Sequence, residues 1–369
     1  MSSNSPGDFM KSQASGDAGQ TESQWLARYE QDGWAAQEKS PELSYQLFTQ
    51  GRDEARRLNE PWWVLHYECW RLNSLTSFLM DFTRAAPLAT ELMARFSTPQ
   101  GLTHSDRLHV LHNVLYTYVN TDPLGFREDL EKGFAYLDRE IAPGPVPERA
   151  VLYHRWQAYL IAIEDWEAVY EMALRSLALL TRLHNVHSRN WYTAWTLDQH
   201  CQICHALGKR DELAGHADHL VEVSQKRGNL LRTEATGLIW QAFCRRAKGD
   251  EKAASKSFHL GMALLEDLER RDSICADAIA AYYEAGGDLK AAIAVRDREF
   301  AEVSRKGMLH RSCQIQIERC RLLDRARELT PADVEAVRRS ATRLRLPKWY
   351  VDKLQRFEAP GHHTDAETP

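Results

Sequence analysis

Two cysteines and two histidines have the spacing of zinc ligands. Cys201 and Cys204 are separated by two residues, and His216 and His219 repeat that spacing further along the chain. Thiolate sulfur and imidazole nitrogen are the ligands of four-coordinate zinc sites. Alternatively, the cysteines pack in the core as small apolar residues and the histidines are solvated. We favour the packed core, because no knuckle turn separates the cysteines, and we predict neither metal nor cofactor.

Other histidines also lie close together in the sequence. His200 and His205 flank the cysteine pair, and His109 and His112 form an i, i+3 pair near His104. Neighbouring imidazoles can bind a metal or respond to pH. No third ligand follows His109 and His112 at a fixed spacing, so we interpret them as ordinary surface or groove histidines.

Side-chain amides recur eight or nine residues before successive turns of the chain. These amides are Asn73, Asn113, Gln157, Gln202 and Gln241. An amide both donates and accepts, so a row of amides can bind the backbone of an extended peptide whatever its sequence. Aromatic and basic side chains nearby could contact the side chains of that peptide, namely Tyr67, Trp70, Arg71, Tyr116, His154 and Trp191. The alternative is that the amides bond neighbouring side chains between helices, or are simply exposed polar positions.

Helical hairpins are the elements that would position these residues. Short turns recur every 38 to 46 residues and carry a residue that caps helices, at Ser40, Asp81, Asp122, Asp165, Asp211, Asp250, Asp288 and Thr330. A repeat of about 40 residues without alternating strand patterns indicates stacked helix pairs. We therefore predict an all-α fold with antiparallel hairpins over 21–57, 61–97, 104–140, 147–183, 187–227, 229–270, 272–306 and 309–344.

One stretch of the chain resembles a known repeat family. Residues 280–293 combine small residues in a first helix, a tyrosine, a Gly-Asp turn and an Ala-Ile pair in a second helix. The preceding hairpin repeats the pattern at Ala242, Gly249, Asp250, Ala254 and Gly261. The pattern resembles the tetratricopeptide (TPR) repeat over residues 230–305 and more weakly over 21–228, where several turns lack glycine. The resemblance implies a right-handed α-solenoid of about eight hairpins with a concave binding face.

The domain organisation follows from these hairpins. We predict one continuous solenoid over residues 21–357, whose last helix, 347–357, caps the exposed end of the stack. The proline-rich segment 141–147 could be a hinge, but the repeat passes through it unchanged. Residues 1–20 and 358–369 are expected to be disordered tails, because they are polar and have no hydrophobic pattern.

Composition narrows the class of protein. The net charge of −5 provides no general attraction to nucleic acid or anionic membranes, so we expect neither partner. Residues 305–357 nevertheless hold 14 Lys or Arg against 6 Asp or Glu; we interpret them as a solvated face balanced by the acidic remainder of the chain. No apolar run is long enough to span a membrane. Seven cysteines, an odd number, favour a reducing cytoplasm.

These observations favour a binding protein over an enzyme. The sequence holds no glycine-rich nucleotide loop, no HExxH motif and no nucleophile elbow. We predict a non-catalytic scaffold or adaptor that binds a protein or extended peptide in the concave groove, and the sequence indicates no oligomeric state. The alternative is a peptide- or ligand-responsive regulator similar to bacterial TPR sensors, although no helix-turn-helix segment accompanies the repeats. A metal-dependent enzyme would have to use the Cys/His cluster.

Overall fold

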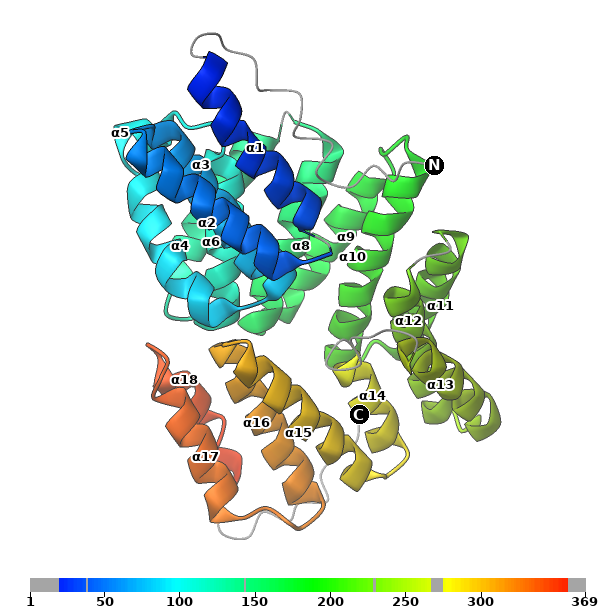
Figure 1. Ribbon diagram of the computed structural model, residues 1–369. Helices are drawn as coiled ribbons and strands as arrows, with labels where there is room; N and C mark the ends of the chain where they lie inside the picture. Colours follow the sequence, from blue (N-terminus) through cyan, green and yellow to red (C-terminus); the bar gives the residue numbers. More distant parts are fainter. Residues whose placement is uncertain (1–19, 38, 143, 228–229, 267–274, 358–369) are drawn as a thin grey trace. The chain divides into compact units, whose positions relative to one another are not determined.

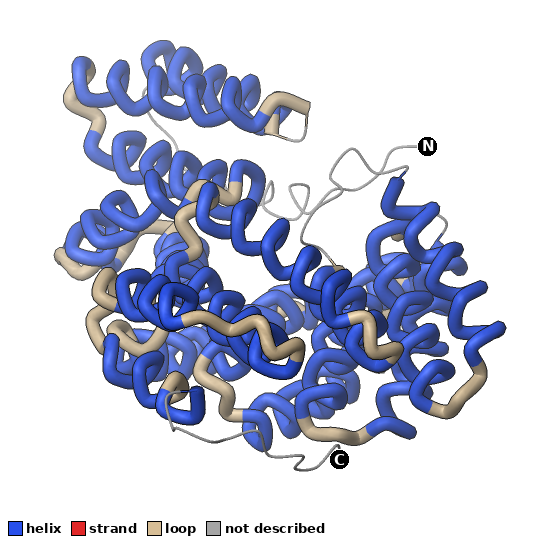
Figure 2. The backbone as a smooth tube through the Cα atoms, turned by 90° about the horizontal axis from the view of Figure 1, so that it is seen from below, coloured by secondary structure: helices blue, strands red, loops and turns tan. Residues whose placement is uncertain are grey.

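The computed structural model describes residues 20–357, apart from 38, 143, 228–229 and 267–274 (Figure 1). In these residues every regular element is a helix, and short loops join consecutive helices (Figure 2). The all-α prediction is therefore confirmed. The chain divides into two compact units, residues 1–117 and 118–369, whereas the sequence predicted one continuous stack. The boundary falls inside a helix and not at the proline-rich segment 141–147.

The first unit is built from two helix pairs, a short helical turn and most of one further helix. Its helices are α1 (Gln20–Ala36), α2 (Pro41–Arg57), α3 (Pro61–Asn73), α4 (Phe82–Phe96), the single turn α5 (Pro99–Leu102) and most of α6 (Arg107–Thr121). A π-helical stretch, η2 (Ser74–Leu79), continues α3. Leu26, Phe48 and Tyr67 are fully buried and join α1, α2 and α3 in one apolar cluster. This packing fixes the faces that α2 and α3 present to α4.

The second unit continues the same arrangement of helices in series. Its helices are α7 (Arg127–Ile141), α8 (Val146–Ala162), α9 (Trp166–Leu180), α10 (Val186–Ala206), α11 (Arg210–Arg227), α12 (Leu231–Ala247), α13 (Glu251–Glu266), α14 (Ala276–Ala285), α15 (Leu289–Arg305), α16 (Leu309–Arg325), α17 (Pro331–Ala341), α18 (Pro347–Asp352) and the 3-10 turn η3 (Gln355–Phe357). Neighbouring helices pack against one another, and α10 also contacts α8 and α12, the first helices of the adjacent pairs. These helix pairs match the predicted hairpins to within a few residues.

Four of the turns between paired helices share one backbone conformation. The residue before the cap is left-handed, with φ of 76° at Gly287 and 82° at Gly249. Met80 and Glu164 adopt the same conformation without being glycine, with φ of 50° and 60°. In each case the following aspartate side chain accepts a hydrogen bond from the backbone N–H three residues later, as Asp288 does from Ala291. The early turns therefore keep the geometry of the later ones despite their different sequence.

The C-terminal helices of the second unit return to its first turns. The backbone N–H of Arg345 donates to Asp122 Oδ2 at 2.8 Å, and Gln314 Nε2 donates to the carbonyl oxygen of Ala162 at 3.1 Å. Lys353 forms an ion pair with Glu164. Leu124 joins the apolar cluster formed by α16, α17 and α18. The segment that the sequence assigned as a cap thus binds residues far earlier in the same unit.

Candidate functional site

In the first unit the predicted amide row begins with two buried asparagines. Asn113 Nδ2 donates to Asn73 Oδ1 at 3.4 Å, which links α6 to α3. Asn73 Oδ1 also accepts from Ser77 Oγ at 3.2 Å. Asn113 is fully buried and Asn73 nearly so, and the half-buried Tyr116 packs edge-on against Phe82. The two asparagines therefore lie at one height on successive first helices, within the packing between them.

The amides of the second unit have three different environments. Gln157 on α8 is fully buried, and its side-chain amide has no hydrogen-bond partner among the described residues. Gln241 on α12 is half-buried and its Nε2 donates to Asp218 Oδ1 at 2.8 Å. Gln202 on α10 is half-buried. The half-buried rings of His154 and Trp191 each contact Trp195 on α10, with ring centroids 5.3 Å and 4.9 Å away.

The aromatic members of the predicted set in the first unit belong to its core. Tyr67 is fully buried and its hydroxyl donates to the carbonyl oxygen of Leu26. Trp70 is buried and packs edge-on against Trp34 with ring centroids 5.2 Å apart. Arg71 differs, because its guanidinium group forms part of a cluster of charges.

Four arginines surround one buried carboxylate in the first unit. Glu68 on α3 is 1% exposed, and its Oε2 lies 2.7 Å from Arg71 Nη1. Its Oε1 lies 3.1 Å from Arg56 Nη2 on α2, 3.7 Å from Arg52 and 3.8 Å from Arg95 on α4. The sequence placed only Arg71 in a site. Glu68 is the signal that could have revealed the cluster, because a lone acid inside an apolar helix must meet positive partners when buried.

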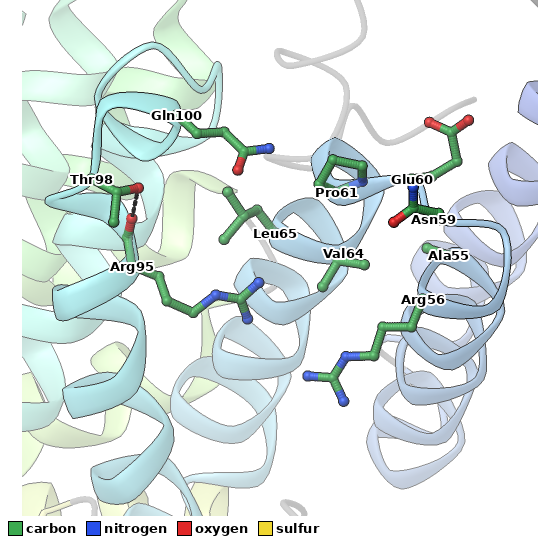
Figure 3. A pocket seen from close by; sticks show the side chains of 10 residues that line it. All are labelled: Ala55, Arg56, Asn59, Glu60, Pro61, Val64, Leu65, Arg95, Thr98 and Gln100. Atoms are coloured by element: carbon green, nitrogen blue, oxygen red, sulfur yellow. Dashed lines mark hydrogen bonds between the residues drawn. The ribbon is translucent and has the colours of Figure 1, made fainter.

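A pocket of about 400 Å³ opens beside this charge cluster (Figure 3). Arg56 and Arg95 extend toward one another from opposite walls, and Val64 and Leu65 of α3 lie between them. The remaining lining residues are Ala55, Asn59, Glu60, Pro61, Thr98 and Gln100. The side chain of Glu60 points away from the space between the arginines (Figure 3). The pocket therefore combines an apolar floor, a polar rim and two converging guanidinium groups.

The charges around the pocket favour an anion. Glu68 is the shared counter-ion of four guanidinium groups, and the only other carboxylates paired with them in the described residues are Asp53 and Glu91. Asp53 and Glu91 are more than half exposed, so water screens their charge. A planar guanidinium group binds a carboxylate through two parallel hydrogen bonds. A carboxylate entering between Arg56 and Arg95 would complete this charge balance.

A histidine and its carboxylates form a second buried group in the first unit. His66 Nδ1 lies 2.6 Å from Asp106 Oδ2, and His66 Nε2 lies 3.2 Å from Glu30 Oε1 without hydrogen-bond alignment. Burial lowers the pKa of His66, but these two carboxylates outweigh it and raise the pKa to about 9. Trp62 stacks against both His66 and His104. This imidazolium lies between two carboxylates in the packing between helices, so we assign it a structural role.

Ion pairs also account for much of the basic C-terminal segment. Asp277 on α14 and Glu299 on α15 both accept from Arg311 on α16 and from Arg296 on α15. Burial opposes ionisation of Asp277, but Arg311 and Arg296 hold the pKa of its carboxyl well below the usual range. Arg321 pairs with Glu284 on α14. Arg311 and Arg321 are thus paired with acids that lie outside the basic segment.

The residues with zinc-ligand spacing do not come together as the sequence pairs them. Cys201 is fully buried in the apolar cluster of α10–α14, and His219 is exposed on α11. Cys204 and His216 do approach one another across the α10–α11 hairpin, and the third residue at that point is His200. His109 packs against Trp70 and bonds Asn113.

Comparison with known proteins gives no relative for this chain. No protein-family model matches the sequence, and no curated protein matches it. None of the described helices is both long and apolar enough to cross a membrane. The helices that pack in consecutive pairs are compatible with a helical-repeat protein, and the candidate site rests on its own geometry.

Proposed function

We propose that this chain is a non-catalytic, TPR-like binding protein that holds an extended polypeptide, and that an acidic group of the polypeptide enters the pocket between α2, α3 and α4–α5. The acidic group is an Asp or Glu side chain or a C-terminal carboxylate. The observation that carries the proposal is the pair of guanidinium groups, Arg56 and Arg95, that converge in the pocket above the shared counter-ion Glu68.

The chemistry of the lining favours a peptide over an inorganic anion. Val64 and Leu65 offer an apolar surface to the methylene groups that carry an acidic side chain. Asn59 and Gln100 also line the pocket, and their side-chain amides can donate to and accept from a peptide backbone. A helical-repeat surface suits such a partner, because an elongated chain gains affinity through many small contacts.

Binding of matched peptides to the full-length protein tests this proposal. An array of peptides containing Asp or Glu is compared with a twin array in which Asn or Gln replaces each acid. We expect binding to a subset of the acidic peptides, weakening of about tenfold or more in the amide twins, and weaker binding at high salt. Equal binding of acidic and amide twins would contradict the carboxylate assignment.

Two variants locate the binding in the pocket. Arg56→Gln and Arg95→Gln each remove one wall of positive charge and should weaken the selected peptides by about tenfold or more. Arg28→Gln removes an equal charge from an exposed position on α1 and serves as the control. If all three variants bind equally well, the peptide does not use this pocket. If no peptide binds to the wild-type protein, the proposed function itself is wrong.

A further inference from the structure

Three side chains that can bind a metal meet inside the α10–α11 hairpin of the second unit. His200 and Cys204 lie one turn apart on the same face of α10, and His216 lies opposite them on α11. One imidazole nitrogen from each histidine and the Cys204 sulfur all lie within 4.8 Å of one another. The left-handed Gly208, with φ of 68°, turns the chain so that α11 runs back along α10. The hairpin itself therefore assembles the cluster.

His200 has no hydrogen-bond partner within the described part of the chain. Its side chain is 0% exposed, and neither Nδ1 nor Nε2 bonds to a described residue. Its ring instead stacks on that of His216, with centroids 4.3 Å apart and planes 18° from parallel. Buried polar groups in native proteins nearly always have partners, so two buried ring nitrogens without one indicate a missing ligand. Simple packing would be served better by an apolar residue at this position.

We propose that His200, Cys204 and His216 bind a zinc ion. Two imidazoles and one thiolate are a donor set that zinc accepts in tetrahedral geometry, with the fourth position left to another ligand. Zinc bonds of about 2.0 Å to nitrogen and about 2.3 Å to sulfur place the ligands about 3.5 Å apart. To close the site, the side chains must move together and the two stacked rings must tilt until both nitrogens face the ion. The site lies in the second unit, and the inference does not depend on the proposed peptide binding.

The surroundings of the cluster suit a cation. Glu212 lies one turn before His216 on α11, and it accepts from the hydroxyl of Tyr170 at 2.5 Å. Lys209 Nζ donates to the same carboxylate at 3.2 Å and lies over the Tyr170 ring. These contacts fix the position of Glu212, and a water molecule can supply the fourth ligand. Glu212 is already paired with Lys209, so the Cys204 thiolate would offset one of the ion's two positive charges.

Zinc binding at this site would release one proton, because a cysteine binds a metal as a thiolate. When zinc binds, the sulfur–hydrogen bond breaks, the zinc–sulfur bond forms and the proton passes to solvent.

Metal titration of the full-length protein tests the site. Protein stripped with a chelator is titrated with Zn²⁺ in competition with a chromophoric chelator, and with Co²⁺ as a spectroscopic probe. We expect one Zn²⁺ per chain, release of one proton, and a near-ultraviolet charge-transfer band from the cobalt–thiolate bond. A stoichiometry near zero together with no cobalt–thiolate band would overturn the proposal without any variant.

Paired variants identify the ligands. Cys204→Ala and His216→Gln remove ligands and should weaken zinc binding by about a hundredfold or more. Cys201→Ala and His219→Gln remove the residues that share the sequence spacing, and both should bind zinc like the wild type. The two cysteine variants are closely matched, because both residues are buried in one apolar cluster. Circular dichroism in metal-free buffer checks their folding, and equal loss of zinc in all four variants would refute the assignment.

Discussion

Raising the pH should destabilise the first unit through a single buried histidine. His66 is 4% exposed and its ring lies between two carboxylates, Asp106 at 2.6 Å and Glu30 at 3.2 Å. The opposing effects of burial and of these carboxylates leave its pKa raised from 6.5 to about 9. Its positive charge is therefore worth more in the folded protein than in the unfolded chain.

The size and direction of the effect follow from linkage. A pKa of about 9 against 6.5 spans about 2.5 pH units, which at about 1.36 kcal/mol each corresponds to about 3 kcal/mol. Because the folded pKa is the higher one, the stabilisation is complete below pH 6.5. It decreases as the pH rises from 6.5 and is lost above a pH of about 9.

Urea unfolding measures this contribution at pH values from about 6 to about 10. Unfolding is followed by circular dichroism, and the unfolding free energies of the variants are compared. The unfolding free energy of the wild type relative to His66→Gln should fall by about 3 kcal/mol across this range. His104→Gln is the control, because His104 stacks on the same Trp62 ring but burial lowers its pKa. A wild-type curve that stays parallel to that of His66→Gln at every pH would refute the reasoning.

Four further substitutions test particular contacts by urea or thermal unfolding. Met80→Gly should stabilise the protein by about 0.5 kcal/mol, because a backbone φ of 50° is strained for a residue with a side chain. Gly287→Ala should destabilise the protein by about 1 kcal/mol for the same reason. A loss of stability in Met80→Gly would contradict the assignment of strain to this turn. Glu68→Gln should lower the unfolding free energy by about 3 kcal/mol, because it leaves the surrounding arginines without their shared counter-ion. An unchanged urea midpoint would show that water already screens the arginine charges. Asp277→Asn should lower the unfolding free energy by about 2 kcal/mol at pH 7. The difference in unfolding free energy from wild type should narrow below about pH 4, because a carboxyl group with a lowered pKa stabilises the fold only while it is ionised. A difference that does not change with pH would contradict the ionic origin.

The helices could be predicted from the sequence because their boundaries depend on local chemistry. Pro41, Pro61 and Pro331 each begin a helix, where a missing N–H and a fixed φ are tolerated. Thr330 and Asp333 form a reciprocal capping box, and their spacing in the sequence is typical of the start of a helix. Asp122 was expected to cap a helix, but it accepts from Gly125 and Arg345 instead. The contact with Arg345 cannot be predicted from local sequence, because that residue lies more than two hundred positions away.

The candidate sites were harder to predict because they depend on the rotation of each helix. A change of one residue turns a side chain by about 100°, so spacing along the chain does not decide which neighbour points across a hairpin. Cys201 and Cys204 share a spacing pattern, but only Cys204 faces His216. His200 replaces Cys201 at that point, one helical turn before Cys204. The spacing thus points to the hairpin in which such side chains approach one another, but it does not show which three do so.

The contacts of the C-terminal helices with the first turns of the second unit change how this unit should unfold. In an open stack each repeat contacts only its neighbours, so unfolding can begin at either free end. Here Asp122 binds the backbone of Arg345, and Glu164 pairs with Lys353, across sequence separations of 223 and 189 residues. The last helices therefore cannot separate without exposing Leu124 and breaking the contacts of the first turns. Because both ends of the unit share these contacts, the unit lacks a free terminal repeat at which fraying could start, and its helices should unfold together.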